Sequence, residues 1–237
     1  MREAGIKALI FGLLLVFLFS AGPVRAEEAA LPGQAKAAAE KALSWDSYKT
    51  DFVLDTKEEN GTVFLLRGTL VYRKPGQRRL QIREGDATQE TQTLVCDGKV
   101  EWQYYPGLNV VYRIDNPPEA PGPHRPFTDV KPETVRFVKK MEGPEGALLR
   151  FEAEPQPKSV EGSPVPVKTV RLDLSETDGM LREMVMLDDK GDPVLTQRFT
   201  GLEVGVRLQD DQFQFTVPEG VSVTQLPGTP PQEKGEN

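Results

Sequence analysis

The sequence predicts an α+β fold built on a strongly curved antiparallel sheet, with one or two helices on its inner face. Three observations lead to this prediction. From Tyr48 onward the chain breaks into about ten short stretches in which apolar and polar residues alternate, as they do in strands. Turn-forming pairs such as Asp97-Gly98 separate these stretches. One stretch before them, residues 34–44, is rich in alanine and has the composition of a helix.

The first 26 residues have the features of a cleavable secretory signal peptide. Arg2 and Lys7 precede an apolar run from Ala8 to Phe19, and small residues lie just before Glu27. The run is shorter than the roughly 20 apolar residues that suit a membrane crossing, although an uncleaved anchor helix is the alternative. No cysteine stands at the cleavage point to accept a lipid. We therefore expect a periplasmic protein that is exported through residues 1–26 and is not lipid-anchored.

The rest of the chain is predicted to hold one domain. Residues 27–33 form a leader, residues 34–224 the domain, and residues 225–237 a disordered tail. Loss of the signal peptide removes three cations and one acid, which takes the net charge from −7 to −9. A chain this acidic is not expected to bind nucleic acid. Cys96 is the single cysteine, so an internal disulfide is excluded.

The predicted strands follow one another as a meander after the helix at 34–44. They are expected at about residues 48–55, 63–72, 78–83, 91–96, 99–105, 109–114, 147–152, 167–174, 180–187, 193–202 and 213–215. Residues 115–129 contain five prolines and are expected to form a loop or lid. Residues 133–141 suit either a short helix or a strand. The pattern therefore predicts the class of fold and leaves the secondary structure of residues 133–141 open.

Catalytic and metal-binding motifs are not recognisable in the sequence. His124 is the lone histidine, cannot build a zinc site by itself, and is expected to be solvated in its proline-rich loop. Cys96 lacks a partner that would activate it and is expected to be a small buried residue. The DDKGD stretch at 188–192 is predicted to be a turn. Scattered carboxylates leave a glycosidase-type pair open without favouring it. We expect no catalytic residue, no metal and no cofactor.

Apolar side chains on the strands are the strongest functional feature. A sheet covered by too few helices leaves a cavity, and an apolar cavity suits a lipid or acyl chain. An ordinary sandwich core is the alternative. The residues expected to line the concave side are Phe52, Leu54, Phe64, Leu70, Tyr72, Leu80, Ile82, Leu94, Trp102 and Tyr104.

Four stretches together resemble the LolA family of periplasmic outer-membrane lipoprotein carriers, over about residues 36–224. They are GTLVYRKPGQRR (68–79), LVCDGKVEWQYYPGLNVVYR (94–113), LDLSETDGMLREMVMLDDKGDPVLTQRFTGLEVG (172–205) and FQFTVPEGVSV (213–223). The resemblance implies an incomplete barrel with helices as a lid over an apolar concavity. It also implies a carrier, not an enzyme, that binds the acyl chains of lipoproteins or other lipids as a monomer. Its implied partners are an inner-membrane lipoprotein-releasing transporter and an outer-membrane acceptor.

The cations before Pro75 are the candidate latch. In the family an arginine directly before this proline bonds to the lid, and here that position is Lys74, with Arg73 one residue earlier. A lysine lacks the planar donor fork of arginine. Alternation along a regular strand places Arg73 on the opposite face. The resemblance implies that one of these cations, Lys74 by position, latches the lid or meets the polar end of the cargo; a solvated basic turn is the alternative.

Two further functions stay open within the same fold. One is a LolA-like protein with another lipid as cargo. The other is an RseB-like sensor that binds lipid or peptide signals and regulates an envelope stress response. Such sensors carry a second domain, for which we expect no room in this chain. Likeness of fold does not separate these functions from the carrier.

Overall fold

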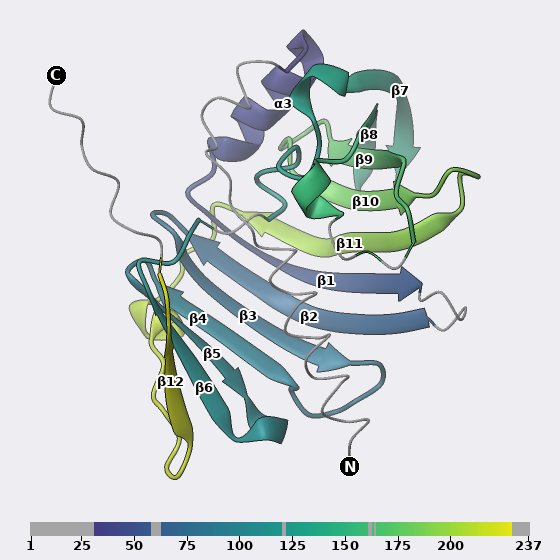
Figure 1. The fold of residues 1–237 in the computed structure, drawn as a ribbon. Coiled ribbons are helices and arrows are strands. Elements are labelled where there is room, and N and C mark those ends of the chain that lie inside the picture. Colours follow the sequence, from purple (N-terminus) through teal and green to yellow (C-terminus); the bar gives the residue numbers. More distant parts are fainter. Residues whose placement is uncertain (1–30, 58–62, 120–121, 161–162, 164, 229–237) are drawn as a thin grey trace, which may run out of the picture. The chain divides into compact units, whose positions relative to one another are not determined.

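The computed structural model describes residues 31–57, 63–119, 122–160, 163 and 165–228. The predicted signal peptide, most of the predicted leader and tail residues 229–237 lie outside this range. The described residues form one α-helix, twelve strands and four short 3-10 helices (Figure 1). No helix in the described ranges has the length and apolar character that a membrane crossing needs.

The helix predicted at 34–44 is confirmed as α3 (Gly33–Leu43). The strands are β1 (Ser47–Lys57), β2 (Val63–Arg73), β3 (Gln77–Glu84), β4 (Gln92–Asp97), β5 (Val100–Tyr105), β6 (Val110–Asp115), β7 (Arg136–Gly143), β8 (Gly146–Ala153), β9 (Thr169–Ser175), β10 (Leu181–Leu187), β11 (Pro193–Val204) and β12 (Ser222–Leu226). The 3-10 helices are η1 (Pro106–Leu108), η2 (Pro132–Thr134), η3 (Pro157–Ser159) and η4 (Asp210–Phe213).

All twelve strands belong to one sheet, in the order β12-β6-β5-β4-β3-β2-β1-β11-β10-β9-β8-β7. The order has two ends, so the sheet is not closed into a barrel. Strands β2 to β6 and β7 to β11 pair antiparallel with their neighbours, as predicted. β12 is an exception, because it runs parallel to β6 and takes up the first two residues of the predicted tail. The lid over an apolar concavity stays a prediction.

One segment differs from the sequence prediction, and the structure assigns another that the sequence left open. The strand expected at 213–215 is wrong, because η4 and irregular chain occupy these residues. The ambiguous segment at 133–141 divides into η2 and the strand β7.

The described chain divides into two compact units. The first comprises residues up to 45, 54–64 and 120–199, and the second comprises residues 46–53, 65–119 and 200 onward. The first unit therefore holds α3, β7 to β10 and part of β11, whereas the second holds β3 to β6 and β12.

Helix α3 packs closely because its buried face is made of alanine. Its buried residues are Ala35, Ala38, Ala39 and Ala42. The turn between β9 and β10 approaches this face at Gly179, where φ is +75°. A Cβ atom there would lie 2.8 Å from the backbone nitrogen of Ala42, so only glycine permits the approach.

The core of the first unit lies on one face of its strands. Phe151, Leu172 and Met184 are directly opposite one another on β8, β9 and β10, and all three are buried. The loop before β7 adds Phe127, whose ring meets that of Phe151 edge-on at 5.5 Å. His124 in this loop is only 2% exposed, so the predicted solvated histidine is wrong. The loop packs on the sheet, with the amide of Leu181 donating to the carbonyl of Pro123.

The opposite face of the same strands carries a row of charged residues, which we call the charge ladder. Its members lie opposite one another in the order Lys139, Arg150, Asp173, Glu183 and Arg198. The Arg150 guanidinium donates two hydrogen bonds of 2.7 Å to the buried Asp173 carboxylate. This hydrogen bonding raises the pKa of Arg150. Arg198 donates to Glu183 at 2.8 Å, so acids and bases neutralise one another across most of the row.

Arg150→Leu is expected to lower the free energy of unfolding by roughly 3 kcal/mol, because it leaves the Asp173 carboxylate buried without its partner. Urea denaturation measures the change. Arg136→Leu is the matched control, because Arg136 pairs with Glu152 at 2.5 Å with its side chain 70% exposed. An exposed pair contributes at most about 1 kcal/mol. Equal losses in both variants contradict the importance of the buried pair.

Candidate functional site

An apolar row crosses one face of the sheet in the second unit. Leu70, Leu80 and Leu94 lie directly opposite one another on β2, β3 and β4. Each is at most 6% exposed. Ile82 lies one step along β3 on the same side and is also buried. We call this side of the sheet the apolar face.

Phe52 from β1 lies over the apolar face at Gly68. A Cβ atom on Gly68 would sit 2.6 Å from Cε1 of Phe52, which is closer than real side chains approach. Gly68 is opposite Ile82, so the ring stands next to the apolar row. The glycine of the GTLVYRKP stretch is therefore needed for the close approach of an aromatic ring to the strand.

The predicted residues Leu54, Phe64 and Tyr72 also lie on β1 and β2. Leu54 and Phe64 belong to the first unit, and their part in a cavity stays a prediction. Tyr72, at the end of β2, stacks on Tyr48 with the ring centres 5.1 Å apart.

Trp102 and Tyr104 lie on the opposite face, so the expectation that all ten residues share one side is wrong. Leu94 on β4 is opposite Gln103 on β5, whereas Trp102 is opposite Val95, the residue that follows Leu94. Side chains alternate between faces along a strand, so β5 points these two aromatic residues away from the apolar row. The side on which Trp102 and Tyr104 lie depends on the register of β4 against β5, and the pattern of apolar residues in the sequence does not predict that register.

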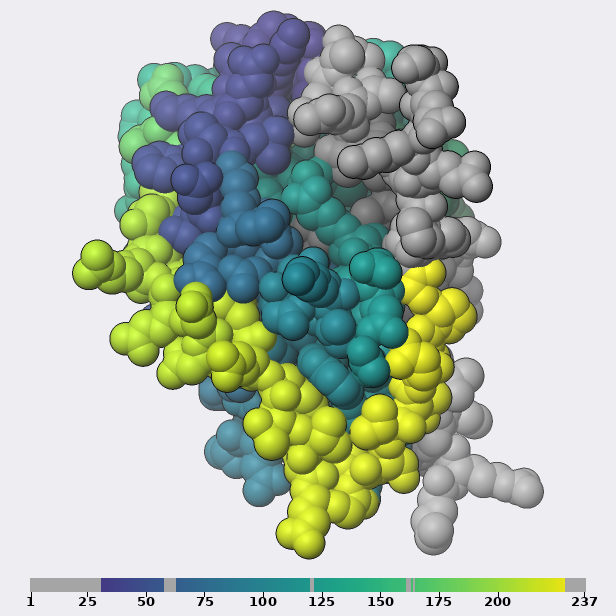
Figure 2. All heavy atoms as spheres, turned by 90° about the vertical axis from the view of Figure 1, so that its left-hand side faces the viewer, coloured from purple at the N-terminus to yellow at the C-terminus, as the bar shows by residue number. Residues whose placement is uncertain are grey.

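Residues 205–221, between β11 and β12, cover this second face; we call them the strap. The Phe215 ring stacks on Trp102 at 5.9 Å and meets Tyr104 at 6.1 Å. Val95 and Val111 beneath are fully buried. Figure 2 shows the yellow-green strap against blue and teal residues of the same unit. The strap therefore supplies the apolar partners of the second face from within the chain.

Arg73 fastens the strap at the end of β2. Its guanidinium donates to the Leu208 carbonyl at 3.0 Å and to the Asp210 carboxylate at 2.5 Å. Its Nε donates to Gln77 at 2.8 Å, and its Cζ lies 4.8 Å from the centre of the Phe213 ring. A planar fork with several donors is suited to such simultaneous bonds. Arg73 thus holds a covering segment, although that segment is the strap and not the proline-rich stretch at 115–129.

Lys74 lies in the turn that follows. Its ammonium forms an ion pair with Asp46 at 3.4 Å, and its amide donates to the Asp46 carbonyl at 2.8 Å. Pro75 lies between β2 and β3, as the sequence predicted for the end of pairing. A lid contact of Lys74 stays a prediction.

The apolar face ends in a buried ion pair that the sequence analysis did not single out. Arg78 lies opposite Tyr72 and Cys96, and Cys96 lies opposite Glu101. Arg78 donates to Glu101, and both side chains are at most 6% exposed. Gln103 donates to the same carboxylate at 2.6 Å. Arg78 stands in phase with Leu80 and Ile82, and this period of two is the signal that places it on the apolar face.

Cys96 is buried beside this pair, as the sequence predicted. Burial raises the pKa of the thiol, against a smaller lowering by Arg78. The neutral thiol is a poor nucleophile. The apolar face therefore offers hydrocarbon contacts that end at a buried, paired charge.

Three comparisons with known proteins bear on this geometry. Residues 44–216 match the family described as "Outer membrane lipoprotein carrier protein LolA". The chain belongs to the LolA family. An outer-membrane lipoprotein carrier protein of Nitrosomonas europaea is 30% identical over 219 residues, which cover 91% of this chain and 97% of that protein.

Solved structures are similar in fold to this LolA-family chain. An uncharacterized conserved protein from Thermus thermophilus has a TM-score of 0.57 at 15% identity, over 81% of this chain and 98% of that one. The Pseudomonas aeruginosa MucA/MucB complex contains a chain with a TM-score of 0.48 at 18% identity, over 78% of this chain and 62% of that one. At 15% identity the likeness to the Thermus thermophilus protein concerns the fold alone, and nothing is argued from the second, whose TM-score is below 0.5.

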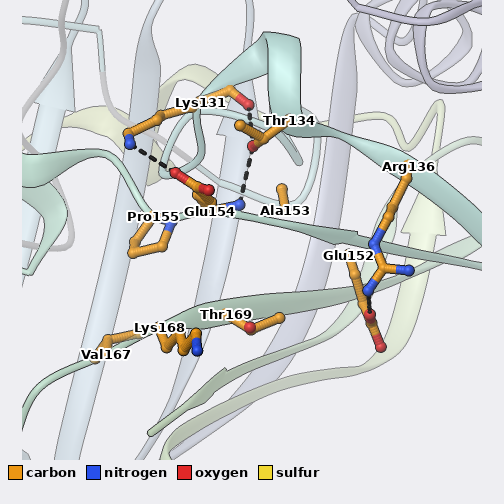
Figure 3. Close-up of a pocket in the computed structure, with 10 residues that line it drawn as sticks. All are labelled: Lys131, Thr134, Arg136, Glu152, Ala153, Glu154, Pro155, Val167, Lys168 and Thr169. Atoms are coloured by element: carbon orange, nitrogen blue, oxygen red, sulfur yellow. Dashed lines mark hydrogen bonds and ion pairs between the residues drawn. The ribbon is translucent and has the colours of Figure 1, made fainter. Parts of the chain in front are cut away.

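A separate open pocket of about 460 Å³ lies in the first unit (Figure 3). Its Lys131 pairs with Glu154 at 2.7 Å. The Thr134 hydroxyl donates to the Lys131 carbonyl and accepts from the Glu154 amide. In this LolA-family chain these groups of the pocket are therefore engaged with one another.

Arg73→Ala is expected to loosen the strap, because three hydrogen bonds and the contact with Phe213 are lost together. The free energy of unfolding should fall by about 2 kcal/mol. Hydrogen exchange of amides in residues 206–215 should become faster. Lys74→Ala is the matched control, since its ion pair is exposed and contributes less than about 1 kcal/mol. Unchanged exchange in the strap of Arg73→Ala contradicts its role as the fastener.

Tyr105→Phe tests the far end of the apolar face. Burial, the largest cause, raises the pKa of Tyr105 from 10 to about 12, and Gln92 donates to its hydroxyl at 2.7 Å. The folded state thus favours the neutral phenol, so this stability is complete below pH 10 and is lost between pH 10 and 12. Urea denaturation across this interval should show a smaller decline in Tyr105→Phe than in the wild type. An identical decline contradicts the assignment; Tyr104→Phe is the control.

Proposed function

We propose that this protein is a periplasmic carrier that binds the acyl chains of lipoproteins on its apolar face and shuttles them from the inner to the outer membrane. Membership of the LolA family supports the carrier class. The observation that carries the proposal is the division of the second unit into a face covered by its own strap and a face of aliphatic side chains. The cargo would lie along Leu70, Leu80 and Leu94 on the apolar face.

The physical reason is a matching of surfaces. A hydrocarbon chain needs contiguous apolar contacts, and burial of each methylene stabilises the complex by roughly 0.8 kcal/mol. Phe52 and Ile82 extend the row to the sides. Because these residues are almost fully buried, loading requires that the apolar face be uncovered first.

Export and partners belong to the same proposal. Residues 1–26 would direct the chain to the periplasm, where it would accept cargo from a lipoprotein-releasing transporter and deliver it to an outer-membrane acceptor. Lys74 is proposed to contact the lid or the polar end of the cargo, while Arg73 keeps the strap on the opposite face. The carrier would act as a monomer and would need no catalytic residue or cofactor.

Leu70→Glu is expected to weaken binding of a fluorescent fatty acid by roughly tenfold or more, because a carboxylate would stand in the apolar row without a partner. Fluorescence titration of the delipidated protein measures affinity, and circular dichroism checks that the variant is folded. Val223→Glu on β12 is the matched control, since Val223 is 50% exposed. Leu94→Met, a change of similar volume, should keep the affinity. No binding by the wild type, or equal loss in Val223→Glu, contradicts the proposal.

A further inference from the structure

Strand β7 is an edge of the sheet in the first unit. It ends the strand order, and Figure 1 shows it as the outermost arrow of its group. Among the described residues, β8 alone forms backbone ladder bonds with residues 136–143. An edge strand presents unpaired N–H and C=O groups that another extended chain is able to bind.

Apolar side chains are exposed at this edge. Phe137 and Val138 are each 40% exposed. The Phe137 ring contacts the buried Phe151 ring at a centre distance of 5.7 Å, so it continues the core to the rim of the sheet. Val138 stands at a bulge between Phe137 and Lys139, where the register to β8 shifts. An added strand would find an apolar contact here that solvent now covers.

The charge ladder ends at this edge with two cations side by side. Lys139 lies opposite Arg150, and Arg150 is engaged by Asp173. Lys139 itself forms no ion pair with any described residue. Like charges in opposite positions are unfavourable, whereas an acid on the open side of Lys139 would give this lysine a neighbour of opposite charge.

Two of the cations on β7 are already paired with acids, Arg136 with Glu152 and Lys140 with Glu176. The strand sequence RFVKKMEG has three cations and one acid. Lys131 and Lys168 line the pocket beside the start of the strand (Figure 3). Lys168 has no ion pair with the described residues. Lys139 and Lys168 are therefore the cations here that an acidic side chain of a partner is able to pair with.

We propose that the open edge of β7 binds an acidic, extended segment of a partner protein as an added strand. An acidic side chain of that segment lies beside Lys139, and an apolar one packs on Phe137. Backbone hydrogen bonds supply the affinity and these two side-chain contacts supply the specificity, as in other cases of strand addition. The surface is independent of the apolar face proposed for lipid cargo, because it belongs to the other unit.

The probe is a fluorescein-labelled peptide of alternating Glu and Val, with an alternating Lys and Val peptide as its counterpart. Fluorescence anisotropy measures binding to the full mature chain, and hydrogen exchange reports the amides of β7. Lys139→Glu should weaken binding of the acidic peptide by about tenfold. Lys190→Glu makes the same change of charge at an exposed turn and should leave the affinity unchanged.

Binding of the acidic peptide alone, loss in Lys139→Glu only, and protection of β7 amides support the proposal. Four results overturn it. In the first, the wild type binds neither peptide. The lysines and the bulge would then serve to prevent pairing of the edge strand with other chains. In the second, Lys190→Glu loses as much affinity as Lys139→Glu. In the third, the amides of β7 gain no protection from hydrogen exchange. Either result would mean that the peptide binds through the net charge of the protein and not at β7. In the fourth, sedimentation of the protein alone shows a dimer that Lys139→Glu abolishes, which assigns the edge to a second copy.

Discussion

The contact between Arg73 and the strap decides the organisation of the second unit. One guanidinium, placed at the last residue of β2, bonds to the backbone of the strap at Leu208 and to its side chain at Asp210. It thereby holds Phe213 against the strand end, and Phe215 follows onto Trp102. Two stretches that are far apart in the sequence, RKPG and FQF, thus form one interaction.

This contact gives the two faces of the sheet different uses. The face under the strap is filled by aromatic rings from the same chain, as an ordinary core is. The other face holds aliphatic side chains in a row, with Gly68 admitting the Phe52 ring. The Arg78–Glu101 pair closes that row and removes two charges from solvent. A buried pair of this kind is weak support for stability, but it places a fixed polar boundary at the end of an apolar surface.

The two faces of the sheet also differ in the first unit, where one face is apolar and the other is charged. Its strands bury Phe151 and Leu172 on one face and carry a row of acids and bases on the other. Neutralisation is complete in the middle of the ladder, at Arg150 and Asp173, and incomplete at its end on β7. This edge exposes Phe137 and carries Lys139, which has no ion pair within the described part of the chain. At the opposite end of the strand order, β12 has no charged residue.

The sequence by itself determined the α-helix, most strands, the family and the apolar character of the candidate site, because these follow from residue type and a local period of two. It also predicted opposite faces for Arg73 and Lys74, whereas β2 ends at Arg73 and Lys74 lies in the turn that follows. Only the tertiary structure decided that Trp102 and Tyr104 face the strap, because their side depends on the register between β4 and β5. It also decided that residues 213–215 form no strand, that β12 pairs parallel with β6, and that His124 is buried. Each of these outcomes depends on contacts between residues distant in the chain, which local pattern does not contain.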